Sequence, residues 1–223
     1  MGWTLLTLAA YLTARAVYRR WPRPWTNPVA LAVAVLLVAV GRTDALADYQ
    51  AGTRVLVWLL KPAVVALGYA LHREVRTVAR HAGRFLAGVG LGSATSLVAT
   101  PLLARALGAP EALQRALAFK SVTSGIAVDL APLHGADPAL TVPLVILTGI
   151  LGAALGVPVL RALGVRRPFF LGAALGTASH GIGTARAAEE GPEALAAGGL
   201  AMAVSGLITG LLAPLLLPPI GLG

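Results

Sequence analysis

Three long uncharged runs constrain the fold of this chain more than any other feature of its sequence. They cover residues 85–104, 138–160 and 194–223 and contain 20, 23 and 30 residues. A helix rises 1.5 Å per residue, so about 20 apolar residues span the roughly 30 Å hydrocarbon core of a bilayer. We expect each run to form a membrane-spanning helix.

The composition supports the same class of protein. Hydrophobic residues make up 57% of the chain and charged residues 12%, with a mean hydropathy of +0.79, whereas soluble domains carry about 25% charged residues. The net charge of +9 comes almost entirely from arginine, since Lys61 and Lys120 are the only lysines. In a membrane protein this indicates basic loops on one face rather than nucleic-acid binding. No cysteine is present, which excludes disulfides and thiolate chemistry.

Shorter apolar segments at 1–18, 28–41 and 55–71 bring the expected number of spanning helices to about six. The first segment has its positive charges after the apolar run, which is the reverse of a cleavable signal peptide. The fold class that follows is an all-α, polytopic membrane protein. We expect the chain, 1–223, to form a single integral membrane domain.

Two further segments, 111–131 and 168–190, are too polar for simple spans. In the first, Lys120 and Asp129 bracket eight uncharged residues rich in hydroxyls; the second contains the glycine-dense stretch Gly172–Ala187. Glycine weakens a helix by about 1 kcal/mol per residue, and polar groups inside a membrane usually face a cavity or a partner. We therefore expect two broken helices that line a site. Close helix packing through small residues is the alternative, but it explains neither His180 nor Arg186.

The positions of the basic residues test the topology. Loops at 15–23, 73–84 and 161–167 hold 11 of the 18 lysines and arginines, so all three should be cytoplasmic. If 111–131 crossed the bilayer, the third loop would lie on the opposite side from the other two. A re-entrant hairpin at 111–131, whose arms of about ten residues reach roughly half the bilayer, removes the conflict.

A weak internal repeat has an offset of 56 residues. The sequence Arg-Ala-Leu-Gly occurs at 105–108 and 161–164, and Gly-Ile occurs at 125–126 and 181–182. Such identities also arise by chance in a chain rich in Ala, Leu and Gly. If the repeat is real, 85–131 and 141–187 form two inverted repeats, a hallmark of secondary transporters. They would lie between N-terminal helices in 1–84 and a C-terminal helix in 194–223.

The polar residues of the two breaks favour an anionic substrate. Lys120 and Arg186 provide fixed positive charge beside several hydroxyls, and the N-termini of half-helices add positive dipole ends. Either basic side chain could instead reach the membrane interface. The candidate substrate-binding residues are Lys120, Ser121, Thr123, Ser124, Thr177, Ser179, His180, Thr184 and Arg186.

Coupling to protons would need a group that titrates near neutral pH, and His180 is the natural candidate. It could equally be a neutral histidine that hydrogen-bonds to a carbonyl. Asp129 is a second candidate for coupling, or a residue at the end of a hairpin. His72, His81 and His134 lie in polar loops and should be solvated. No zinc-ligand spacing, catalytic triad, P-loop or dinucleotide motif occurs, so we expect no enzyme, no metal and no cofactor.

Two stretches carry a resemblance to a known family. KSVTSGIAVDL (120–130) and GTASHGIGTARA (176–187) resemble the two signature stretches of the LrgB/CidB family. Asn27-Pro28, LLKPAVVAL (59–67) and LAMAVSGLITGLLAPLLLP (200–218) match in the same order. The chain departs from the family at Gly125, Gly181 and Ser205, where proline, alanine and asparagine are usual.

The resemblance implies transport of small monocarboxylates such as glycolate, glycerate, pyruvate or lactate, since plant members are plastidial glycolate/glycerate translocators. Bacterial members were also described as holin-like or antiholin-like proteins that modulate murein hydrolase activity and cell lysis. We expect a proton-coupled carboxylate transporter in a bacterial inner membrane. The alternative is a holin-like pore or lysis regulator. Expected partners are the carboxylate, the bilayer, and a second copy in a dimer or a small LrgA/CidA-like membrane protein.

Overall fold

The computed structural model describes residues 2–21, 23–73 and 75–222, and all regular structure in these residues is helical. The expected all-α membrane fold is confirmed. By its internal contacts the chain divides into two compact units, Met1–Tyr69 and Ala70–Gly223. The elements are α1 (Gly2–Arg20), η1 (Pro24–Thr26), α2 (Pro28–Thr43), α3 (Leu46–Gly52), α4 (Arg54–Arg73), α5 (Val75–Ala106), α6 (Glu111–Ala118), α7 (Ser124–Leu130), η2 (Pro132–His134), α8 (Pro138–Ala162), α9 (Pro168–Ala187), η3 (Ala188–Glu190), α10 (Pro192–Leu216) and η4 (Pro218–Ile220).

Three helices of the described residues, α5, α8 and α10, are long and apolar enough to cross a membrane, and α2 is a shorter apolar helix. Helices α5 and α8 contain the uncharged runs at 85–104 and 138–160, and α10 contains the part of the third run up to Leu216. The expected spans at 1–18 and 55–71 form α1 and α4, of 19 and 20 residues. That α1, α2 and α4 also cross the bilayer stays a prediction.

In the first unit, α2 begins at Pro28, the first residue of the apolar segment 28–41. The Asn27 side chain accepts hydrogen bonds from the backbone N–H groups of Val29 (3.0 Å) and Ala30 (3.1 Å), which satisfies two free donors of the first turn. The residues between the apolar segments 28–41 and 55–71 are not a simple loop, because α3 forms among them. Trp3 of α1 packs edge-on against Tyr49 of α3, with ring centroids 5.8 Å apart.

The basic loop expected at 73–84 is wrong, because α5 begins at Val75 and runs without a break to Ala106. Arginine favours helix nearly as well as alanine, so three arginines spaced by four residues do not interrupt it. His81, expected to be solvated, stacks on Phe169 of α9 with centroids 4.9 Å apart. His134 is half-buried on Phe119, with centroids 5.5 Å apart, and burial lowers the pKa of its imidazole.

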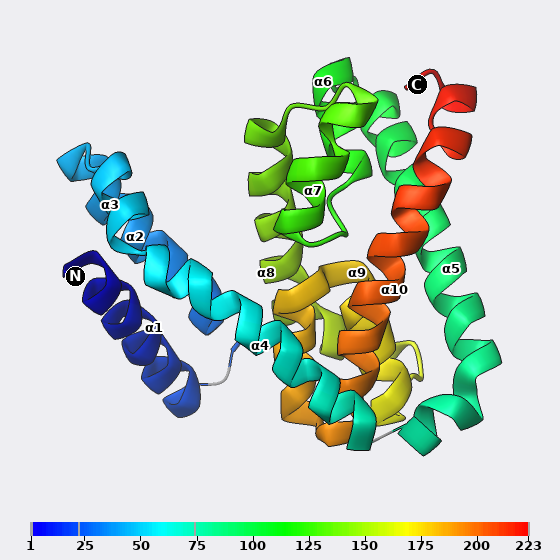
Figure 1. Ribbon diagram of the computed structural model, residues 1–223, viewed down its shortest axis with the longest axis horizontal. Helices are drawn as coiled ribbons and strands as arrows, with labels where there is room; N and C mark the ends of the chain where they lie inside the picture. The colour runs from blue at the N-terminus through cyan, green and yellow to red at the C-terminus, as the bar shows by residue number, and fades with distance from the viewer. Residues whose placement is uncertain (1, 22, 74, 223) are drawn as a thin grey trace. The chain divides into compact units, whose positions relative to one another are not determined.

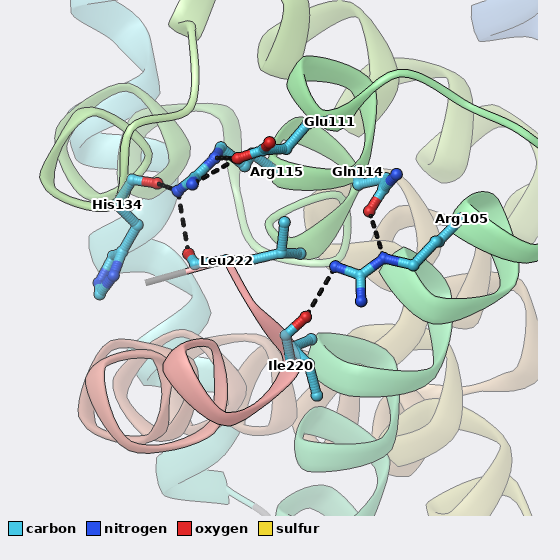
Figure 2. Close-up of polar contacts among 7 residues, drawn as sticks. All are labelled: Arg105, Glu111, Gln114, Arg115, His134, Ile220 and Leu222. Atoms are coloured by element: carbon cyan, nitrogen blue, oxygen red, sulfur yellow. Dashed lines mark hydrogen bonds and ion pairs between the residues drawn. The ribbon is translucent and has the colours of Figure 1, made fainter.

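The first predicted hairpin is present as α6 and α7, separated by a non-helical break at 119–123. Its two ends lie together, because Arg115 Nη1 on α6 donates to the carbonyls of His134 (3.1 Å) and Leu222 (3.0 Å), as Figure 2 shows. Arg105 of α5 donates to Gln114 of α6 (3.0 Å) and to the Ile220 carbonyl (2.7 Å). These contacts fix the base of the hairpin against the C-terminal end of the chain.

The second predicted hairpin is α9, which changes direction at Ser179 (φ −135°, ψ 18°) and His180 (φ 43°, ψ −133°). Beyond this point the chain runs back along its own first half. A Cβ atom added at Gly183 would lie only 2.5 Å from the Leu175 carbonyl oxygen. An ion pair between Arg161 at the end of α8 and Glu190 of η3 (2.6 Å) holds the base of this hairpin.

The first half of α9 packs directly on the backbone of α10. A Cβ at Gly172 would overlap the carbonyl of Ala194, and a Cβ at Gly176 would overlap that of Gly198. Both pairs advance by four residues in the same direction, so these helical segments are parallel. Small-residue packing, the alternative for this stretch, therefore explains Gly172 and Gly176.

The two hairpins belong to opposite ends of the second unit. In Figure 1, α6 and α7 lie beside the upper part of α8, and α9 lies in the lower part of the unit. Because α5 precedes one hairpin and α8 precedes the other, the arrangement is one that an inverted repeat would produce. The repeat itself and the single-domain organisation stay predictions.

Single cysteines test this topology on a chain that has none. Leu107 and Leu133 are exposed and flank the first hairpin, and the exposed residues Leu163 and Ala188 flank the second. A membrane-impermeant thiol reagent should label Leu107→Cys and Leu133→Cys from outside, and Leu163→Cys and Ala188→Cys from the cytoplasm. If the two members of either pair label from opposite faces, the segment between them crosses the membrane and the hairpin is refuted.

Candidate functional site

A cavity of about 590 Å³ lies between α5, the break of the first hairpin and the first half of α9. The break of one hairpin and the region just before the break of the other therefore reach the same space. Most of the lining is apolar. The lining residues are Arg84, Phe85, Gly88, Val89, Leu91, Gly92, Thr95, Ser96, Ala99, Thr100, Lys120, Ser121, Phe170, Ala173, Ala174, Thr177 and Ala178.

Lys120 is held by hydroxyl groups. Its Nζ donates to Ser121 Oγ at 2.9 Å and to Ser96 Oγ at 3.2 Å, and the two serine oxygens are themselves 2.9 Å apart. No carboxylate forms an ion pair with Lys120 in the part of the chain that the structure describes. A half-buried ammonium group without a counter-ion beside two hydroxyls is suited to bind an anion.

Sequence reasoning missed Ser96, because it lies inside an uncharged run that reads as a simple span. The stretch SATSLVAT at 93–100 does carry hydroxyls at helical spacing. Ser96 and Thr100 face the cavity, while the buried Ser93 pairs with Ser205 of α10 at 2.8 Å. That spacing was the available indication that α5 contributes to a polar site.

Thr177 also lines the cavity, and its hydroxyl donates to the Ala173 carbonyl at 2.7 Å. Thr123 and Ser124 serve the start of α7 instead. Thr123 is the N-cap, and its Oγ1 accepts from the Ile126 N–H at 3.3 Å. Of the predicted binding residues, the structure thus brings Lys120, Ser121 and Thr177 to one cavity.

Ser179, His180 and Thr184 are buried at the break of α9 and do not line the cavity. His180 Nε2 lies 2.9 Å from the Val145 carbonyl on α8. A carbonyl can only accept, so Nε2 carries a proton, as in the alternative expected for this residue. Thr184 donates to the His180 carbonyl at 2.9 Å. Ser179 packs directly against Gly152, where an added Cβ atom would overlap the Ser179 side chain.

Arg186 and Asp129 lie elsewhere. Arg186 Nη1 pairs with Glu190 at 3.0 Å and with Glu189 at 3.4 Å, at the base of the second hairpin. Asp129 is exposed and lines a separate groove of about 380 Å³ between α7 and α10. Neither lines the cavity beside Lys120. Their predicted roles in binding and coupling stay predictions.

The match to known families is decisive for classification. The family model of the LrgB-like family matches residues 7–218, nearly the whole chain. The chain belongs to the LrgB-like family. The resemblance carried by the two signature stretches is confirmed, and this LrgB-like protein has both stretches at the two breaks, 119–123 and 179–180.

Curated relatives cover most of this LrgB-like chain. It is 33% identical to the uncharacterized protein YxaC of Bacillus subtilis, over 95% of this chain and 92% of the relative. It is 32% identical to YwbG of the same organism, over 95% of both chains. It is 29% identical to the antiholin-like protein LrgB of Bacillus mycoides, over 86% of this chain and 84% of that one. None of these three relatives is named as an enzyme. No solved structure matches the chain.

Cysteine reactivity tests the cavity directly. We expect Ser96→Cys to react with a small methanethiosulfonate reagent added to the purified protein, because this position lines the cavity. Ser93→Cys is the matched control, since Ser93 lies one turn away on α5, is buried and pairs with Ser205. Equal labelling of the two positions, measured by mass spectrometry, would show that the cavity is not an accessible compartment.

Proposed function

We propose that this LrgB-like protein is a secondary transporter of small monocarboxylates, of the glycolate, glycerate, lactate or pyruvate type, in a bacterial inner membrane. The observation that carries the proposal is Lys120 at the break of the first hairpin. It faces a largely apolar cavity with no acidic side chain in its described lining. Ser96, Ser121 and Thr177 supply neutral donors around the same space. A small carboxylate matches this combination of one cation and several hydroxyls.

Desolvation gives these contacts their strength. Hydrogen bonds to charged groups contribute about 1.5–3 kcal/mol each, and more of that strength is retained where water is excluded. A carboxylate between Lys120 and the serine hydroxyls would replace the contacts that now join those groups. The apolar walls formed by Val89, Ala173 and Ala174 would face the short carbon chain. Binding would thus replace internal hydrogen bonds by hydrogen bonds to the substrate, and few polar groups would be left without a partner.

Transport in proteoliposomes tests this proposal. Uptake of labelled glycolate or lactate should saturate, and unlabelled substrate on the far side should accelerate it by exchange. Lys120→Gln should raise the half-saturating concentration at least tenfold, which corresponds to the loss of about 1.4 kcal/mol or more. Arg166→Gln is the matched control, because it removes one positive charge from an exposed loop position.

One outcome would contradict a carrier, and another would contradict the role of Lys120. Non-saturating flux that also passes unrelated solutes of similar size would indicate a pore. Saturable uptake with the same half-saturating concentration in the wild type and in Lys120→Gln would show that Lys120 does not bind the substrate, although the protein transports it.

We further propose that His180 couples transport to protons. Its Nε2–H is engaged by the Val145 carbonyl, so Nδ1 is the ring atom that would take up a proton with the anion. Such uptake would reduce the charge that moves across the membrane. Asp129 is the second proposed coupling residue, although it lies in a different groove from Lys120.

The coupling proposal predicts a separation of binding from accumulation. His180→Gln can still donate to the Val145 carbonyl but cannot titrate between pH 5 and 8. It should therefore exchange labelled for unlabelled substrate at equilibrium yet fail to concentrate substrate under an imposed pH gradient. Asp129→Asn is assayed in parallel. Full gradient-driven accumulation by the His180→Gln protein would exclude His180 as the coupling residue.

An antiholin-like regulator of cell lysis is the second candidate, and the name of the Bacillus mycoides relative supports it more directly than it supports carboxylate transport. In that case the chain would act with a second copy or with a small LrgA/CidA-like membrane protein. Expression in a bacterial host and measurement of lysis rate with and without such a partner distinguish the candidates. A change in lysis that Lys120→Gln leaves intact would favour regulation independent of the cavity.

A further inference from the structure

Arg84 lines the same cavity as Lys120 but lies far from it along α5. Lys120 Nζ contacts Ser96, and Ser96 and Arg84 are twelve residues apart in one uninterrupted helix. At 1.5 Å per residue this separation is about 18 Å between the two backbone positions. Arg84 is exposed while Lys120 is half-buried, so the two cations occupy an outer and an inner end of one cavity. Sequence reasoning assigned Arg84 only to a basic loop.

One row of residues on α5 between the two ends consists of glycines. Arg84, Gly88, Gly92 and Ser96 are spaced by four residues and all line the cavity. A Cβ atom added at Gly88 would have no neighbour within 4 Å, and one at Gly92 would meet only the Thr177 methyl group at 3.3 Å. These glycines leave a row without side chains along α5, which we call the glycine track, from Arg84 to the Lys120 hydroxyl cluster. The track is open at Gly88 and is narrowed by the Thr177 methyl group at Gly92.

The guanidinium of Arg84 has no acidic partner among the described residues. Among the residues that the structure describes, no ion pair joins it to a carboxylate, and the described lining of the cavity contains no Asp or Glu. By contrast, Arg161 and Arg186, which the sequence places near the second hairpin, are both paired with Glu190. The positive charge of Arg84 is thus directed at the cavity without a neutralising partner.

Aromatic rings surround the outer end. Phe85 and Phe170 line the cavity beside Arg84, and His81 one turn earlier packs against Phe170 with centroids 5.6 Å apart. Arg84 itself is exposed, so an anion can reach its guanidinium from water at this end of the cavity. Arg80 lies one turn from Arg84 on the same helix, is exposed and does not line the cavity.

We infer that Arg84 is an outer anion-binding position, which captures a carboxylate at the exposed end of the cavity before it moves along the glycine track to Lys120. The inference rests on the proposed function for its substrate class. An acid of two or three carbons is too short to bridge the two cations, so it binds them in sequence. Arg84 would govern capture at low substrate concentration, whereas Lys120 would govern binding at the inner site.

Reactivity of Ser96→Cys tests Arg84 without any transport assay. The rate of its reaction with a sulfonate-bearing methanethiosulfonate is compared with that of an uncharged reagent of similar size. Arg84→Gln should lower the ratio of anionic to uncharged rates by about tenfold at low salt, and 1 M salt should remove most of the difference. Arg84→Lys should retain the ratio, and Arg80→Gln is the matched control that should leave it unchanged.

Equal effects of Arg84→Gln and Arg80→Gln would reduce Arg84 to a general surface charge and overturn the inference. So would an unchanged ratio in Arg84→Gln. Because Arg84→Lys preserves charge and similar length, its behaviour separates loss of charge from misfolding.

Transport kinetics then connect the inference to the proposed function. In proteoliposomes Arg84→Gln should reduce glycolate uptake at low concentration with little change in the maximal rate. If the labelling ratio falls as expected but no carboxylate is transported, the outer anion position stands and the proposed substrate class fails. If carboxylates are transported and the labelling ratio does not change, the proposed function stands and Arg84 has no role in capture.

Discussion

The approach of α9 to α10 is the contact on which the functional half of this structure depends. At Gly172 and Gly176 any side chain would overlap the carbonyl of Ala194 or Gly198, so the two backbones meet without intervening side chains. In lipid, where apolar surface gives little drive for helix association, such close van der Waals contact is a main source of stability. It holds the first half of α9 parallel to α10 and so places Thr177 at the cavity. The reversal at His180 then returns the chain to the base from which it came.

Charge and hydroxyl chemistry are divided between the bases and the tips of the hairpins. The bases are held by guanidinium groups, with Arg115 on two backbone carbonyls in one case and Arg161 on Glu190 in the other. The breaks instead rely on hydroxyls and one ammonium group. Charged pairs at the ends remain near water, where their desolvation is small. Under the proposed function, such neutral donors would suit a site within the membrane at which a substrate binds and leaves again.

The sequence predicted the elements that depend on the residue types within their own segment. The uncharged runs predicted α5, α8 and α10. Polar residues in the first segment and dense glycine in the second predicted the two breaks, including the one at His180. It failed where tertiary contacts decide. The helix α3 and the arginine-bearing start of α5 both make aromatic contacts that the sequence does not reveal, Tyr49 of α3 with Trp3 and His81 of α5 with Phe169. The same limit applies to the site. Ser96 was missed because the sequence does not show which face of α5 meets the cavity, and Arg186 was included because the sequence does not show its pairing with Glu190.

Glycine has two opposite uses in this chain. At Gly172 and Gly176 the missing side chain makes room for another backbone, so a substitution there acts on the fold. At Gly88 the missing side chain leaves empty space, and a methyl group would enter the cavity without touching any neighbour. A substitution at position 88 would therefore narrow the cavity near its outer end without disturbing the packing of the helices.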